Sequence, residues 1–275
     1  MSEMRVSLPH LVPIADGDEV RRGPKAFADF LERNSGGYRV VENPHFRGTR
    51  PYAEYANAED LDLSLDKLYS RASSLGTGPI FFGGEHTVTF HLVSFLLKRF
   101  DSLCLLIFDA HSDCQGDDNQ LHNWNFLRKL KDAYGRRLSV IHVGFRDVDE
   151  RDLEDFCDEV LHIDTIARQG LEYVQKRIES LCTDRQVHIS VDVDVLDPLM
   201  FQSVKSPISG GLLPVQIISI LRALAGQSIV SADIVEFSAN QPSLMEMLLL
   251  ADLFYSLEKL CGHKGNVPRS NADPI

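Results

Sequence analysis

Residues 103–113 read LCLLIFDAHSD, an apolar run of six residues followed by alternating polar side chains. An uninterrupted apolar run of this length is typical of a strand buried on both faces of a parallel sheet. Asp109, His111 and Asp113 follow at every second position, so an extended strand end would point all three the same way. Ionised groups beside a buried strand are costly unless something neutralises them. The segment therefore predicts a strand end that holds a cation.

Two other segments repeat this arrangement. Residues 79–86, PIFFGGEH, end in His86, and residues 187–198, VHISVDVDVLDP, carry Asp192 and Asp194 after an apolar run. In an open parallel sheet, ligands bind beyond the carboxyl ends of the strands. We therefore expect the polar side chains of all three segments to converge. They are His86, Asp109, His111, Asp113, Asp192 and Asp194.

Two histidines and four aspartates make an oxygen-rich ligand set. Such a set suits Mn²⁺ best, with Fe²⁺ or Co²⁺ as alternatives, and suits zinc less well. Six ligands with bridging carboxylates fit two ions roughly 3.5–4 Å apart. Two adjacent ions of this kind imply a metal-activated water, and hence a hydrolase. Asp197 and Pro198, which close the third segment, are expected to form a turn.

Apolar strands alternate with helical periodicity from about residue 79 onward, which indicates βα units and a mostly parallel sheet. Pro24 is expected to open an earlier helix. His142 and His188 fall inside predicted strands and are expected to be core residues with satisfied hydrogen bonds. Nothing divides the chain, so we predict one domain over residues 1–275, with a loose polar tail at 263–275. Strands are predicted at 80–82, 103–108, 138–143, 187–191 and 228–235.

The composition restricts the partners. The 275 residues carry a net charge of −12, which argues against nucleic acid or an anionic membrane and is compatible with a cationic substrate. The five cysteines are odd in number and scattered, as expected for reduced thiols in the cytosol. No apolar run approaches the roughly 18 residues of a membrane helix. We therefore expect a soluble cytoplasmic protein.

The three segments resemble the signatures of the ureohydrolase family of arginases, agmatinases and formiminoglutamases. Those signatures, Gly-Gly-Asp-His, Asp-Ala-His-x-Asp and Ser-x-Asp-x-Asp-x-x-Asp-Pro, match residues 83–86, 109–113 and 190–198, with Glu85 in place of the first aspartate. The resemblance implies a three-layer α/β/α fold with a mostly parallel central sheet. It also implies two Mn²⁺ ions per chain, held by the six converging residues, and a homo-oligomer, either a trimer or a hexamer.

The resemblance also implies catalytic roles. Glu236, in the segment ADIVE, resembles the glutamate that pairs with the substrate guanidinium, a planar cation suited to a carboxylate. His122 resembles the loop histidine that protonates the leaving amine, a role suited to histidine at neutral pH. Asn123 stands where the family usually has glycine. Asp113 would help the metals to stabilise the tetrahedral intermediate.

The substrate is expected to be a small guanidino compound that is recognised by the loop at 114–120. Two carboxylates in this loop would repel a substrate carboxylate and attract an amine, which favours agmatine or a similar guanidino amine. Arginine or hydroxyarginine is one alternative, and formiminoglutamate or another guanidino acid is a second. The candidate substrate-binding residues of the loop are Gln115, Asp117, Asp118 and Asn119.

Two other protein classes are compatible with these segments. Metal-dependent deacetylases resemble this architecture but hold one zinc through two aspartates and one histidine. The additional candidate ligands His86, Asp113 and Asp194 argue against that class. A non-catalytic homologue that keeps the metal site would serve as a binding partner, and the presence of His122 and Glu236 argues against it.

Overall fold

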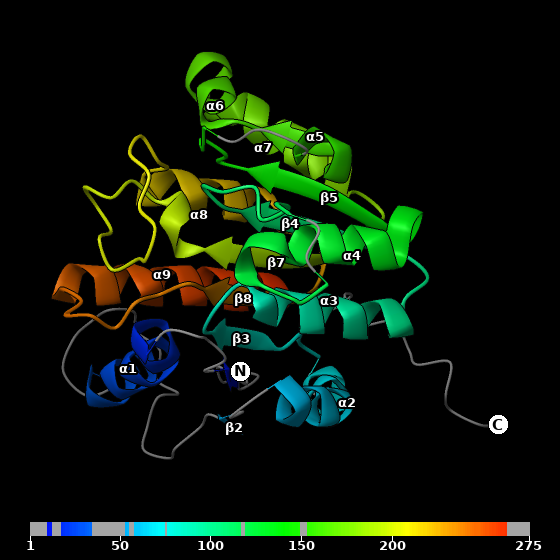
Figure 1. The fold of residues 1–275 in the computed structure, drawn as a ribbon, viewed down its shortest axis with the longest axis horizontal. Coiled ribbons are helices and arrows are strands. Elements are labelled where there is room, and N and C mark those ends of the chain that lie inside the picture. The colour runs from blue at the N-terminus through cyan, green and yellow to red at the C-terminus, as the bar shows by residue number, and fades with distance from the viewer. Residues whose placement is uncertain are drawn as a thin grey trace, which may run out of the picture.

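The structure is a computed structural model that describes residues 10–12, 18–34, 53–54, 58–74, 76–116, 119–148 and 153–262. Its centre is an eight-stranded sheet in the order β2-β1-β3-β8-β7-β4-β5-β6, and every pair of neighbouring strands is parallel. Helices flank this sheet (Figure 1). The predicted three-layer α/β/α architecture is confirmed.

The strands are short at the edges of the sheet and longest at its centre. They are β1 (His10–Val12), β2 (Ala53–Glu54), β3 (Ile80–Gly83), β4 (Leu103–Phe108), β5 (Leu138–Val143), β6 (Glu159–Leu161), β7 (Gln186–Asp192) and β8 (Ser228–Val235). The five strands predicted from the sequence correspond to β3, β4, β5, β7 and β8.

The helices follow the strands along most of the chain. They are α1 (Asp18–Asn34), α2 (Ala58–Ser74), α3 (Thr87–Arg99), α4 (Phe126–Tyr134), α5 (Leu153–Phe156), α6 (Ile163–Gln169), α7 (Leu171–Cys182), α8 (Pro214–Ala223) and α9 (Leu244–Cys261). Single 3₁₀ turns lie at Asn123–Asn125, Gly135–Arg137 and Val193–Val195.

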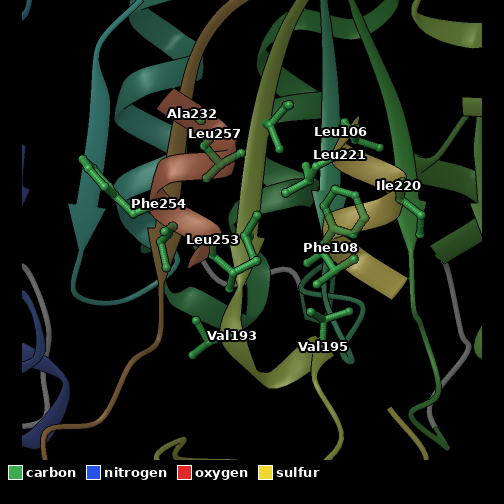
Figure 2. Close-up of a cluster of buried hydrophobic side chains, with 14 of the residues drawn as sticks. Leu106, Phe108, Val193, Val195, Ile220, Leu221, Ala232, Leu253, Phe254 and Leu257 are labelled. Atoms are coloured by element: carbon green, nitrogen blue, oxygen red, sulfur yellow. The ribbon is translucent and has the colours of Figure 1, made fainter. Parts of the chain in front are cut away.

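Side-chain alternation along the strands builds two separate apolar cores. In β4, Leu106 and Phe108 pack into one core with residues of α8 and α9, as Figure 2 shows. Leu105 and Ile107 point to the opposite face and pack into the second core with α2, α3 and α4. All six β4 side chains are buried, because each face of the sheet is covered by helices.

Helix α1 begins earlier than predicted. It starts at Asp18, and Pro24 lies inside it, although an interior proline removes one hydrogen bond of the helix. Contacts with the chain after β8 stabilise the first turn, since the Ala239 N–H donates to the Glu19 carbonyl at 3.0 Å. A Cβ on Gly23 would lie 2.3 Å from the Phe237 carbonyl oxygen, so only glycine permits this close approach.

No helix in the described part of the chain is both long and apolar enough to cross a membrane. The predicted tail at 263–275 lies outside the described residues. The single-domain organisation stays a prediction.

Candidate metal centre

Four neighbouring strands end at one edge of the sheet. Strands β3, β8, β7 and β4 are consecutive in the sheet and parallel, so their carboxyl ends are adjacent. His86 follows β3, Asp109 follows β4, Asp192 ends β7 and Glu236 follows β8. The parallel topology therefore brings together residues that are up to 150 positions apart.

His86 lies in the middle of three aspartates. Its Nδ1 is 3.1 Å from Asp109 Oδ2, 3.0 Å from Asp113 Oδ2 and 3.4 Å from Asp192 Oδ2. The His86 ring is fully buried and lies against the Phe126 ring, with 4.3 Å between centroids. This packing leaves Nδ1 facing the carboxylates.

His111 forms a second group with two of the same residues. Its Nδ1 is 2.9 Å from Asp194 Oδ2 and 3.6 Å from Asp109 Oδ1. Asp109, His111 and Asp194 have the geometry of a metal site, and so do His86, Asp109 and Asp192, with the candidate ligand atoms of each group within 4.8 Å of one another. We call these sets the His111 cluster and the His86 cluster. Asp109 belongs to both.

Backbone N–H groups orient the carboxylates. The His111 N–H donates to Asp109 Oδ1 at 2.7 Å, and the Asp194 N–H donates to Asp192 Oδ1 at 2.8 Å. Asp113 has a φ of 48°, a left-handed conformation that is unusual for any residue but glycine. Such backbone strain is often found at functional sites, where the surrounding structure holds it in place.

The carboxylates repel one another at this edge. Burial and the Asp109 charge raise the pKa of Asp113 to about 7, and burial with the Asp194 charge raises the pKa of Asp192 well above its usual value. Burial opposes the charged form of His111, but hydrogen bonds with Asp109 and Asp194 raise its pKa to about 12. Each of these pKa shifts indicates that a positive charge placed among the carboxylates would be stabilised.

Two buried atoms lack the partner that a cation would supply. Within the described part of the chain, His86 Nδ1 and Asp109 Oδ2 have no hydrogen-bond partner. Burial opposes charge on His86, yet its three aspartates raise its pKa well above the usual value. Both observations indicate that a proton or a metal ion belongs between these lone pairs. The donor set of carboxylate oxygens and imidazole nitrogens fits Mn²⁺.

Glu236 lies beside the His86 cluster. Its Oε1 accepts a hydrogen bond from the His86 backbone N–H at 2.8 Å, and its own N–H donates to the Gly84 carbonyl at 2.8 Å. Burial raises the pKa of Glu236 to about 7, although the His86 N–H opposes this shift. Its φ of 62° turns the chain sharply after β8. The structure thus places a buried carboxylate next to the candidate ligands.

His122 precedes the 3₁₀ turn before α4. Its ring stacks on Trp124 with 4.6 Å between centroids and 9° between planes, and its N–H donates to Asn125 Oδ1 at 2.8 Å. The chain after His122 contacts the candidate ligand Asp113 at Leu127, whose N–H donates to the Asp113 carbonyl at 3.0 Å.

The predicted substrate loop is described only in part. The Gln115 N–H donates to the Trp124 carbonyl at 3.0 Å, and Asn119 is exposed. Asp117 and Asp118 lie outside the described residues, so their predicted role stays a prediction. Asp197, by contrast, forms the predicted turn, since its side chain accepts hydrogen bonds from the backbone of Leu199, Gly210 and Gly211.

Arg146 is a residue of the site that was not predicted from the sequence. Its guanidinium donates to the carbonyl of the candidate ligand Asp194 at 2.7 Å and to the carbonyls of Val195 and Leu196 at 3.2 Å each. It also donates to the Ile208 carbonyl, at 2.8 Å from Nη2. Arg146 therefore fixes the turn that carries Asp194. The only sequence signal was a charged residue three positions after the β5 strand.

His142 departs from its prediction. It is buried inside β5 as expected, but within the described residues neither ring nitrogen has a hydrogen-bond partner. Burial lowers the pKa of His142 to about 4. The side chain is therefore neutral at neutral pH. It lies beside the Phe145 ring, at 6.0 Å between centroids, and close to the backbone of the candidate ligand His111.

His142→Leu is expected to make the metal-free protein less sensitive to acid. The unfolded chain protonates this histidine near pH 6.5, whereas the folded protein resists protonation until about pH 4. The unfolded state therefore binds more protons in this window, and stability falls as the pH falls through it. Between pH 8 and pH 5 the wild-type protein should lose about 2 kcal/mol more than the variant. Urea unfolding with chelator at both pH values measures this difference, and equal losses would contradict the prediction.

Comparisons with known proteins agree with this geometry. Residues 20–257 match the model of the Arginase family. Guanidinopropionase from Pseudomonas aeruginosa is 30% identical over 183 residues, which are 63% of this chain and 57% of the relative. Agmatinase from Photorhabdus laumondii is 27% identical over 207 residues, which are 75% of this chain and 66% of the relative. The chain thus spans slightly more than half to about two thirds of the length of these relatives.

Solved structures share the fold. Proclavaminate amidino hydrolase from Streptomyces clavuligerus superimposes with a TM-score of 0.71 at 20% identity, covering 95% of each chain. Arginase from Bacillus subtilis also gives a TM-score of 0.71, at 19% identity, covering 95% of this chain and 100% of the arginase. The family model covers most of the sequence and includes all six candidate ligands. The chain therefore belongs to the Arginase family.

Proposed function

We propose that the protein is a binuclear manganese hydrolase that cleaves a guanidino C–N bond and releases urea. The observation that carries the proposal is the position of Asp109, which belongs to both metal-compatible clusters. A shared carboxylate is what two adjacent ions require of their ligands. The ligands would be His86, Asp109, His111, Asp113, Asp192 and Asp194.

The bound metal and three residues of the site would have separate roles in the reaction. Bound Mn²⁺ would supply Lewis acidity and a water activated at neutral pH. Glu236 would pair with the guanidinium and hold its carbon over the centre, because a carboxylate matches the planar cation. Asp113 would help to stabilise the attacking water and the tetrahedral intermediate, and His122 would deliver a proton to the departing amine nitrogen.

The substrate proposed first is a guanidino amine such as agmatine, because the predicted loop carboxylates attract a second cationic group. The net charge of −12 favours the same class of substrate. A guanidino acid is the second candidate, favoured by the similarity to a guanidinopropionase. Arginine and hydroxyarginine remain further candidates. The proposal includes a cytoplasmic location and a trimeric or hexameric assembly, both by resemblance to the family.

Urea release by manganese-loaded protein tests the proposal. The panel is agmatine, arginine, hydroxyarginine, guanidinopropionate, guanidinobutyrate and formiminoglutamate, with formamide measured for the last. Preferred turnover of agmatine supports the full proposal, and preferred turnover of a guanidino acid moves it to the second candidate. Two bound metals without turnover of any compound would favour a non-catalytic homologue. Failure to bind metal would refute the proposal.

His122→Ala is expected to lower kcat by roughly 10²-fold or more and to leave metal content unchanged. The reason is that the departing amine would lose its proton donor, whereas the candidate ligands stay in place. Steady-state kinetics with metal analysis checks both parts. Gln120→Ala, at an exposed position of the same segment outside the candidate substrate-binding residues, serves as the control for general disturbance of the loop. Unchanged kcat in His122→Ala would remove the residue from the catalytic set.

A further inference from the structure

Six polar side chains lie buried in the apolar layer between the sheet and helices α2 and α3. They come from β7, β8, α2 and α3, and none is more than 6% exposed. Burial of this kind is costly unless every polar atom has a partner. We call this set the polar relay. Its members are Tyr69, Thr89, His188, Ser190, Ser231 and Asp233.

The register of two central strands aligns the relay. In the β7–β8 pair, His188 lies opposite Ser231 and Ser190 lies opposite Asp233. Because side chains alternate between the faces of a strand, His188 and Ser190 share one face of β7. Asp192 is the next residue on that face. The relay is thus continuous with the candidate metal centre and leads back from it into the core.

Hydrogen bonds connect the relay to His86. His86 Nε2 is 3.0 Å from Ser190 Oγ, which donates to Asp233 Oδ1 at 2.6 Å. The other oxygen, Asp233 Oδ2, is 2.8 Å from His188 Nε2 and accepts from Thr89 Oγ1 at 3.1 Å. One carboxylate therefore joins the branch that leads to His86 and the branch that leads to His188.

The branch that leads to His188 ends at helix α2. His188 Nδ1 is 2.7 Å from Ser231 Oγ, and the Tyr69 hydroxyl donates to the same Ser231 oxygen at 2.8 Å. Burial raises the pKa of Tyr69 well above its usual value, so this hydroxyl keeps its proton. His188 lies four residues before Asp192, about 13 Å deeper in the sheet at the usual rise per residue.

The hydrogen bonds of the relay determine which atom carries each proton, and we call this assignment the proton order. Because Ser231 accepts from Tyr69, its own proton points to His188 Nδ1. The His188 proton must therefore be on Nε2, from which it donates to Asp233. On the other branch Ser190 also donates to Asp233, so Ser190 accepts from His86 Nε2. This order gives every donor an acceptor and leaves the Nδ1 lone pair of His86 facing Asp109.

We propose that Asp233 is a positioning residue that fixes the metal-binding tautomer of His86 through Ser190, and that Tyr69, Ser231 and His188 hold Asp233 in place from deep in the core. An imidazole that ligates a metal through one nitrogen is commonly fixed by a hydrogen bond from the other. The consequence for metal affinity rests on the proposed function. The proton order does not, because it follows from the protein contacts alone.

The tautomers test the proton order. ¹⁵N NMR of histidine-labelled protein at pH 8 reports which ring nitrogen carries the proton, and His188→Gln assigns the His188 signal. His188 should be neutral with its proton on Nε2 in the metal-free protein. In the Mg²⁺-loaded protein, His86 should carry its proton on Nε2. Asp233→Asn replaces one acceptor oxygen with an NH₂ donor, so one of the two histidines must move its proton to Nδ1.

Metal binding tests the consequence. Calorimetric titration with Mn²⁺ should show two binding steps in the wild-type protein, and Ser190→Ala and Asp233→Asn should weaken one step by about 10–100-fold. Tyr69→Phe provides a milder change at the far end of the relay and should reduce the same step by less. Ser94→Ala, a change at a hydroxyl buried on α3 outside the relay, should leave both steps unchanged.

The outcomes separate this inference from the proposed function. Wild-type affinity for both ions in Ser190→Ala and Asp233→Asn would overturn the positioning role. A His188 proton on Nδ1, or a charged His188 ring, would overturn the proton order. Failure of the wild-type protein to bind Mn²⁺ would refute the proposed function instead, and the His188 tautomer of the metal-free protein would still decide the order of the relay.

Discussion

Asp109→Ala is expected to abolish both metal-binding steps and to lower kcat/KM by at least on the order of 10³-fold, since metal chemistry contributes several kcal/mol to such reactions. Asp109 is the one residue common to the two clusters, and its Oδ1 and Oδ2 face His111 and His86 respectively. Metal analysis after dialysis, together with urea release, measures both effects.

Single-cluster variants sharpen this test. His111→Ala removes a member of the His111 cluster alone, so the protein should retain one ion in the His86 cluster. Asp197→Asn is the control, because Asp197 belongs to the signature segment of the candidate ligands Asp192 and Asp194 but accepts turn hydrogen bonds from Leu199 and Gly210. That variant should keep two ions. Retention of two ions by Asp109→Ala would refute the shared-ligand assignment.

Glu236→Gln is expected to lower kcat/KM by on the order of 10²–10³-fold while both metals stay bound. Removing one partner of a buried charge pair costs about 2–5 kcal/mol, because the guanidinium would then be desolvated without a counter-charge. Glutamine keeps an oxygen that can accept the His86 N–H, so the neighbouring metal ligand should not move. Kinetics at saturating Mn²⁺, with metal content measured on the same sample, separates substrate binding from metal binding.

A second buried glutamate provides the control. Glu246 accepts backbone hydrogen bonds from Gln202 and Ser203 near the start of α9. Glu246→Gln should lower stability but leave kcat/KM for the guanidino substrate within a few-fold of the wild-type value. If Glu236→Gln retains full activity, the guanidinium must be bound by another group.

Much of the candidate site is predictable because its signals are local. Each metal segment combines an apolar strand with polar residues after it, and this local pattern identifies Asp109, His111 and Asp113 as candidates. The expected extended geometry does not continue through them, because β4 ends at Phe108 and Asp113 has a φ of 48°. The convergence of three such segments follows from parallel topology, which the βα alternation indicates. These features depend on residues close in sequence, so the six candidate ligands were accessible without a structure.

Helix α1 and His142 show where local rules fail. Proline normally marks the first turn of a helix, but contacts between Glu19 and Ala239 stabilise a turn that precedes Pro24. His142 lies in a strand like His188, and no local pattern distinguishes the two. Their environments differ because only His188 lies opposite a serine on a neighbouring strand.

The sequence by itself determined the class of fold, the strand ends and the identity of the candidate metal ligands, because each of these depends on short-range periodicity. Only the tertiary structure decided that Asp109 is shared by two clusters, that Arg146 holds the Asp194 turn, and that Asp233 connects His86 to the core. Those relations join residues on different strands and helices. They depend on strand order and register, which are set by packing of the whole sheet rather than by any one segment.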